Sequence, residues 1–236
     1  MTKKSQSQLE RAYYEDFELY CPIAPKGEVT FSDKPDIVVK GANKIGIEIA
    51  NIYLKDGKDL SSEQIQSKLR FNVIQQAKSL YLTGMHPSYA FFFDFDPNVP
   101  ITNTEELSKR VYQRVLKHIQ EQHDDFSNTG LDDCPELRYI SNSGTEKSDA
   151  KWDLIQCYDV PDLSTQRVRE IVAAKASKVA RYQSCDRYWL LLVIELWDPA
   201  QDQHPIWNEQ DKIGPTPFER IIIYKPTTKE WLEVPQ

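Results

Sequence analysis

The sequence lacks any long apolar run, and it lacks the spacings typical of zinc sites and disulfide frameworks. No stretch of its 236 residues is apolar enough to cross a bilayer, and residues 1–6 are not followed by a hydrophobic segment. Its four cysteines show no C-x-x-C spacing, and its four histidines show no metal-binding spacing. We therefore expect a cytoplasmic protein with no membrane partner, whose cysteines are buried thiols.

The composition is that of a globular protein, with 40% hydrophobic and 11% aromatic residues. The net charge of −7 does not by itself suggest a nucleic-acid binder, but residues 121–162 hold eleven acidic residues against three basic ones and account for the excess. Residues 167–187, in contrast, contain six basic residues and two acidic ones. This basic segment fits either a surface that tracks phosphates or a solvated helix face.

Hydrophobic periodicity and turn residues predict alternating helices and strands. The length fits one enlarged α/β domain, which we expect over 1–236, or a core with an insertion. In the first half we expect a helix at 7–20, a strand near 29–31, a hairpin at 36–40 and 45–53, a helix at 61–82 and a strand at 88–95. In the second half we expect a helix at 104–123, a strand at 152–158, a basic helix at 164–182, and strands at 188–197 and 218–224.

Two carboxylates stand out in the predicted hairpin, because Asp36 and Glu48 occur in otherwise apolar strands. Desolvating such groups is costly unless a cation pairs with them. If residues 41–43 form a three-residue loop with Asn43 left-handed, Lys40 pairs with Lys44 and the two carboxylates share a face. A two- or four-residue loop would separate them, and the plain alternative is an ordinary hairpin with an edge Asp and a solvated Glu.

The residues Pro35-Asp36 and Glu48 resemble the motif of the PD-(D/E)xK nuclease superfamily, which has a restriction-endonuclease-like fold. The order of PDIVV, IGIEIAN, AKSLY and K-x-x-K-x-x-x-Y is similar to an uncharacterised bacterial branch of it. The resemblance implies an α-β-β-β-α-β core at 8–96 and a mixed sheet extended by further helices and strands over 103–236. The acidic residues 121–162 are expected to be a loop region within this extension. This chain departs from the Glu-x-Lys motif of the superfamily, because Ala50 stands where the lysine is expected.

Polar residues on predicted buried helix faces suggest further site members. Gln66 and Arg70 fall within the apolar stripe of their helix and need partners, which the two carboxylates or a substrate phosphate would supply. Alternatively, both extend to the edge of the stripe. The resemblance places a metal-supporting Glu on the first helix, for which we choose Glu10 over Asp16.

The basic helix offers a replacement for the absent lysine. Lys175 lies near the centre of an apolar stripe, whose members are Val168, Ile171, Val172, Val179 and Tyr182. A lysine buried there should reach a carboxylate or a phosphate site. We expect it to enter the pocket of Asp36 and Glu48, although its head could instead reach solvent. Lys178, at the edge of the stripe, Arg181 and Arg70 are candidate nucleic-acid-binding residues. Arg70 or a lysine would stabilise the charge that develops during cleavage.

These features predict a metal-dependent nuclease, an endonuclease or exonuclease that uses Mg²⁺ or Mn²⁺ to hydrolyse phosphodiester bonds of DNA or RNA. A second hypothesis is a catalytically silent relative that binds nucleic acid or a partner protein, and a third is an unrelated α/β scaffold. Asp94 and Asp96 offer another metal pair, but acidic residues before a proline usually form turns. The oligomeric state does not follow from the sequence.

Overall fold

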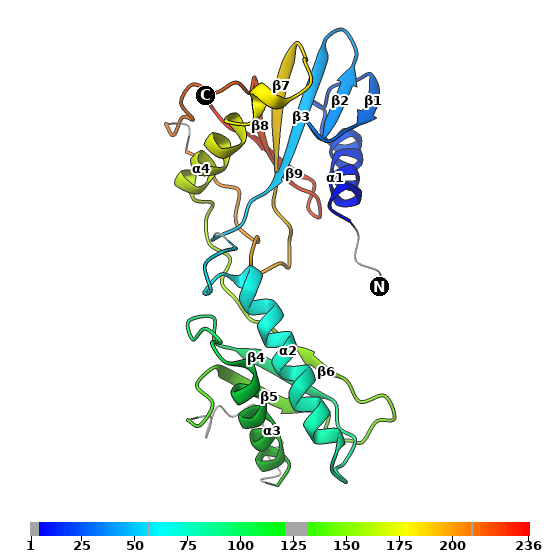
Figure 1. Cartoon of the computed structure of the whole chain (residues 1–236), viewed down its shortest axis with the longest axis vertical. Coiled ribbons are helices and arrows are strands. Elements are labelled where there is room, and N and C mark those ends of the chain that lie inside the picture. Colours follow the sequence, from blue (N-terminus) through cyan, green and yellow to red (C-terminus); the bar gives the residue numbers. More distant parts are fainter. Residues whose placement is uncertain (1–4, 56, 121–131, 209) are drawn as a thin grey trace. The chain divides into compact units, whose positions relative to one another are not determined.

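The computed structural model describes residues 5–55, 57–120, 132–208 and 210–236, and the chain is an α/β protein built as two compact units. One unit contains Met1–Leu54 and Val160–Gln236, and the other contains Lys55–Asp159 (Figure 1). This division differs from the single domain expected over 1–236 and from a contiguous core at 8–96. The physical reason is that Lys55–Asp159 encloses a hydrophobic core of its own.

The first unit contains a six-stranded mixed sheet in the order β1-β2-β3-β7-β8-β9. Its strands are β1 (Glu28–Phe31), β2 (Ile37–Lys40), β3 (Lys44–Asn51), β7 (Arg187–Val193), β8 (Arg220–Lys225) and β9 (Glu230–Glu233). The pairs β3–β7 and β7–β8 are parallel, whereas β1–β2, β2–β3 and β8–β9 are antiparallel. The predicted strands near 29–31, 188–197 and 218–224 are thus present with shifted ends.

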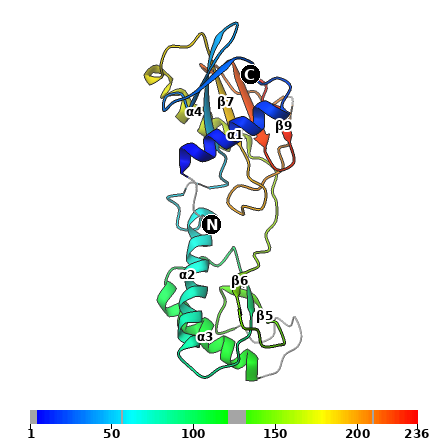
Figure 2. The ribbon, with the colours of Figure 1, turned by 90° about the vertical axis from the view of Figure 1, so that its right-hand side faces the viewer.

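Helices cover both faces of this sheet (Figures 1 and 2). On one face α1 (Gln6–Tyr20) packs Phe17 into a cluster with Ile47 and Leu191. On the other face α4 (Thr165–Ala176) packs Val168 into a cluster with Leu190. Because β7 is covered on both sides, its sequence is a nearly continuous apolar run.

The second unit contains a three-stranded sheet in the order β5-β4-β6. Its elements are α2 (Glu63–Leu82), β4 (Phe91–Phe95), α3 (Thr104–Gln120), β5 (Leu137–Asn142) and β6 (Trp152–Leu154). Ile74, Val111 and Phe93 contribute to its core from two helices and the central strand. The last three residues of the helix expected at 104–123, and residues 121–131 of the acidic region, lie outside the described residues.

The order α-β-β-β-α-β occurs in the first unit, but with different members from those expected. The sequence assigned its last helix and strand to residues 61–82 and 88–95, which form α2 and β4 of the second unit. Within the first unit β3 is followed by α4 and then by β7, which pairs with β3 in parallel. Parallel neighbours need a long crossover connection, and here that connection contains the whole second unit.

None of the helices in the described part of the chain is both long and apolar enough to cross a membrane.

Candidate functional site

The β2–β3 hairpin brings two carboxylates opposite each other. Lys40 pairs with Lys44, so the predicted three-residue loop is confirmed. Counting back along this ladder places Asp36, one residue before β2, opposite Glu48 on β3. The expected left-handed backbone at Asn43 is wrong, since Asn43 is not among the described non-glycine residues with positive φ.

Asp36 is a half-buried carboxyl group held by the backbone of the next strand. Its Oδ2 accepts a hydrogen bond of 2.7 Å from the Ile49 amide. Burial, with smaller contributions from the nearby charges of Glu48 and Glu10, raises the pKa of Asp36 to about 7, although the hydrogen bond from the Ile49 amide and the charge of Lys175 act to lower it. The main cause of the raised pKa is thus the loss of solvent around the Asp36 carboxyl group, and the neighbouring carboxylates add to it.

Glu48 projects from β3 toward the face of the sheet that α4 covers. Side chains alternate along a strand, so Glu48 shares this face with Ala50, which packs in the cluster beneath α4. Only 6% of Glu48 is exposed. A carboxylate this deeply buried requires a cationic or hydrogen-bonding partner.

Lys175 is that partner. Ser164 caps the helix by accepting from Arg167, and Val172 is buried one turn before Lys175. The Lys175 Nζ lies 2.6 Å from Glu48 Oε1 and 3.2 Å from the Ile49 carbonyl oxygen. The predicted approach of this lysine to the Glu48 carboxylate is confirmed.

Gly46 allows other side chains to close over the strand beside the site. A Cβ atom at this glycine would lie 2.8 Å from Pro35 Cγ and 2.9 Å from Tyr188 Cδ1. Both are closer than packed carbon atoms tolerate. The missing side chain of Gly46 therefore lets Pro35, and with it the start of Asp36, lie against β3.

Tyr182 also belongs to this site, although we expected it only as an apolar member of the helix stripe. The helix expected at 164–182 ends at Ala176, and a 3-10 turn at Val179–Arg181 follows. Burial raises the pKa of the Tyr182 hydroxyl, and the charges of Glu48 and Asp36 raise it further. The sequence did carry one indication of this role. Tyr182 has a polar hydroxyl, unlike the aliphatic residues of the stripe, and it lies seven residues after Lys175, on the same face of the predicted helix.

Glu10 lies near the pair without joining it. The charge of Glu10 is close enough to raise the pKa of Asp36, while its Oε1 accepts a hydrogen bond from Gln6 Nε2. The rejected alternative, Asp16, accepts hydrogen bonds from Tyr224 and Lys229 instead. Across the described residues, no three His, Cys, Asp or Glu side chains gather closely enough to hold one ion, so the expected trio of Asp36, Glu48 and Glu10 is not assembled as direct ligands.

Two carboxylates nevertheless fit a magnesium-type ion. Mg²⁺ binds oxygen ligands, often takes only one or two protein carboxylates and keeps several waters. The Lys175 ammonium already marks a point where Glu48 Oε1 and the Ile49 carbonyl oxygen both receive a cation. With Asp36 opposite Glu48, the residues present fit such an ion with three oxygen donors.

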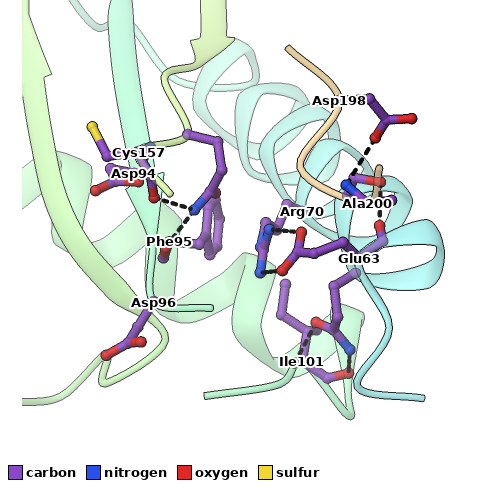
Figure 3. A network of polar contacts seen from close by, with 12 residues as sticks. Glu63, Arg70, Asp94, Phe95, Asp96, Ile101, Cys157, Asp198 and Ala200 are labelled. Carbon is purple, nitrogen blue, oxygen red and sulfur yellow. Dashed lines mark hydrogen bonds and ion pairs between the residues drawn. The ribbon is translucent and has the colours of Figure 1, made fainter. Parts of the chain in front are cut away.

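Gln66 and Arg70 find their partners within the second unit, which corrects the expectation that the two site carboxylates supply them. Arg70 is buried and forms a two-point ion pair with Glu63, with distances of 2.5 and 2.9 Å (Figure 3). Gln66 donates to the carbonyl of Leu60 and accepts from the amide of Ile101. The helix stripe correctly indicated that both are buried, but a residue two turns away and neighbouring backbone satisfy them.

The alternative acidic pair is structural as well. Asp94 accepts hydrogen bonds of 3.0 and 3.2 Å from Arg138, and Asp96 accepts one from the amide of Asn98 within a turn (Figure 3 shows the two carboxylates). All four cysteines are free, and Cys157 is exposed rather than buried as expected.

Lys178 and Arg181 are exposed on the turn that follows α4. Two residues after Arg181, the backbone amide of Gln183 donates a hydrogen bond to the carbonyl of Lys34. Lys34 in turn lies two residues before Asp36. The turn is therefore fastened beside the segment that carries the first carboxylate. Two exposed cationic side chains, Lys178 and Arg181, therefore lie on a turn whose backbone is bonded to the segment before Asp36.

Comparison of the chain with protein-family models, with curated proteins and with solved structures found no match.

Proposed function

We propose that this protein is a metal-dependent nuclease of the PD-(D/E)xK type that hydrolyses phosphodiester bonds of DNA or RNA. The observation that carries the proposal is the meeting of Asp36, Glu48 and Lys175, an acidic pair from one hairpin with a lysine from α4. The order α1-β1-β2-β3-α4-β7 supports the proposal, because α-β-β-β-α-β is the order of elements expected of that superfamily.

In this proposal Asp36, Glu48 and the Ile49 carbonyl oxygen hold Mg²⁺ or Mn²⁺. The bound ion would polarise the phosphate and lower the pKa of the attacking water. This chain has Ala50 at the position where the superfamily has its lysine, and Lys175 takes the role of that lysine. Its ammonium neutralises charge that develops on the phosphate. Arg70 has no part in this step, since Glu63 holds it in the second unit.

Lys178 and Arg181 are proposed to bind phosphates that flank the scissile bond. Both are exposed cations, and neither has an ion-pair partner among the described residues, so each is free to meet a phosphate. Such contacts contribute affinity without sequence specificity and weaken as the salt concentration rises. The negative net charge of the chain does not oppose this, because residues 121–162 account for it and the rest of the chain is close to neutral.

One observation favours a second function, a silent module that binds nucleic acid or a partner protein. Lys175 already neutralises Glu48 through a bond of 2.6 Å, so the buried carboxylate is satisfied without any ion. Such a module would keep the fold and the basic turn but would not need a divalent cation. Metal binding therefore separates the two functions.

The test is Mn²⁺ titration by calorimetry, combined with cleavage of labelled single- and double-stranded DNA and RNA. We expect the wild type to bind Mn²⁺ and to cleave one of these substrates, and Asp36→Asn to lose about tenfold or more in Mn²⁺ affinity. Asp33→Asn is the matched control, because Asp33 is exposed and three residues away. Equal Mn²⁺ affinity of the wild type and Asp36→Asn would overturn the nuclease proposal, and metal-independent nucleic-acid binding without cleavage would favour the silent module.

A further inference from the structure

The backbone around Tyr182 is fixed between α4 and the segment that precedes Asp36. The Tyr182 amide donates to the carbonyl of Val179 and closes the 3-10 turn. The next residue, Gln183, donates its amide to the Lys34 carbonyl at 2.9 Å and its side chain to Ser32 Oγ at 3.2 Å. Tyr182 is therefore held from both sides.

The Tyr182 ring is fixed as well. It packs edge-on against the ring of Tyr188, with centroids 5.9 Å apart and an interplanar angle of 63°. The Tyr188 hydroxyl is itself satisfied, because it donates to the carbonyl of Gln183 and accepts from the amide of Cys185. The ring of Tyr182 thus leans on a neighbour that is anchored by two hydrogen bonds.

The Tyr182 hydroxyl, in contrast, is buried and makes no hydrogen bond of standard length and angle with the described residues. The Glu48 side chain lies within hydrogen-bonding reach of this hydroxyl and is its strongest charged neighbour, followed by Asp36. Leaving a buried hydroxyl without a partner costs free energy. The proton of the Tyr182 hydroxyl is therefore expected to form a hydrogen bond with a nearby acceptor. Glu48 Oε1 already accepts from Lys175, and the same carboxylate offers further lone pairs.

We propose that Tyr182 is a positioning residue, whose hydroxyl donates a hydrogen bond to Glu48 and fixes that carboxylate for cation binding opposite Asp36. Lys175 holds the same carboxylate by charge in the metal-free protein, whereas Tyr182 is a neutral donor that can stay in place when a cation binds. Because the phenol stays protonated at neutral pH, it orients the carboxylate without adding a charge that would repel a metal ion. The inference deepens the proposed function, and only its metal-binding part rests on it.

The first part of the test is a double-mutant cycle on stability, which needs no metal. Tyr182→Phe keeps the ring and its packing on Tyr188 and removes only the hydroxyl. Combined with Glu48→Ala, and with Glu48→Gln as a second acceptor variant, it measures whether the hydroxyl and the carboxylate interact. We expect the two changes to be coupled by about fivefold or more in the unfolding equilibrium constant, measured in EDTA.

The second part measures Mn²⁺ affinity, which a merely structural hydroxyl would not alter. We expect Tyr182→Phe to weaken Mn²⁺ binding by about tenfold, as loss of an orienting partner of a ligand typically does. Tyr14→Phe is the matched control, because it removes another buried hydroxyl without a hydrogen-bond partner among the described residues, in the cluster beneath α1. It should leave the affinity within about twofold of the wild type.

The outcomes are distinguishable. Coupling below about twofold would overturn the Tyr182–Glu48 bond, whether or not the protein binds Mn²⁺. Coupling with unchanged Mn²⁺ affinity in Tyr182→Phe would overturn the positioning role. Coupling in a wild type that binds no Mn²⁺ would overturn the proposed function and the positioning role, while the Tyr182–Glu48 bond itself would stand.

Discussion

The Lys175 ammonium lies 2.6 Å from Glu48 Oε1, although 127 positions separate the two residues in the sequence. The two side chains come from α4 and from β3, and the second unit lies between them along the chain. Their ion pair is half-buried at the lysine and almost fully buried at the carboxylate. Breaking one side of such a pair leaves the other charge poorly solvated, so its members can be tested separately.

Replacing Lys175 with Met should separate binding from catalysis. The ammonium now occupies a place between two oxygen atoms that would also bind a divalent cation, so its removal should strengthen Mn²⁺ binding several-fold. Cleavage should fall by about 100-fold or more, because the charge that neutralises the phosphate is lost. Lys212→Met, which removes another exposed lysine of the same unit, is the control for both calorimetry and the cleavage assay. Weaker Mn²⁺ binding in Lys175→Met would show that the ammonium does not compete with the ion.

Asp36 should make the metal-free protein less stable as the pH rises. Its pKa is about 7 in the folded state and near 4 in an unfolded chain, so the folded state binds the proton more tightly. The stability this provides is complete below about pH 4 and is lost as the pH rises through 7. Asp36→Asn keeps an acceptor for the Ile49 amide but carries no charge. In EDTA the free energy of unfolding of this variant should exceed that of the wild type by about 1–3 kcal/mol at pH 8, and the two should be equal near pH 4.

The measurement for Asp36 is denaturant unfolding at both pH values. Asp33→Asn should follow the wild type throughout, because Asp33 is exposed. A wild type whose stability, relative to Asp36→Asn, does not change between pH 4 and 8 would show that the carboxyl titrates normally.

Arg70→Ala should destabilise the second unit and leave metal binding unchanged. Arg70 is almost fully buried and its ion pair with Glu63 is two-point, so truncation leaves a carboxylate without its partner, at a cost of about 3–5 kcal/mol. Lys68→Ala, on the exposed side of the same helix, should change stability by less than about 0.5 kcal/mol. Thermal unfolding measures the effect on stability, and Mn²⁺ titration measures the effect on metal binding. A loss of Mn²⁺ affinity in Arg70→Ala would show that Arg70 contributes to the metal site after all.

Gly46→Ala should disturb the hairpin beside Glu48. The new Cβ would lie 2.8 Å from Pro35 Cγ and 2.9 Å from Tyr188 Cδ1, and relieving such overlap typically costs about 1–3 kcal/mol. Gly214→Ala is the control, since a Cβ there meets nothing within 4 Å. Equal unfolding midpoints for the two variants would show that Pro35 and Tyr188 can move away from the new methyl group at little cost in free energy.

The local parts of the site followed from the sequence. The register that places Asp36 opposite Glu48 depends on loop length and on side-chain alternation, both of which are short-range properties. The burial of Lys175 followed from helical spacing, because α4 keeps the predicted period as far as Ala176. From there, the cost of a buried ammonium was enough to predict that it meets a carboxylate.

The tertiary structure decided which buried polar groups meet and which elements share a sheet. The same helical spacing that predicted Lys175 also selected Arg70, but Glu63 satisfies Arg70 within its own helix. Residues 61–82 and 88–95 have the pattern of a core helix and strand, and periodicity does not reveal that they enclose a separate core. Tyr182 was read as apolar because the helical count continued past Ala176, whereas the 3-10 turn places its hydroxyl beside Glu48. Spacing along one element determines which residues are buried, but the partner of each depends on long-range packing that no local pattern encodes.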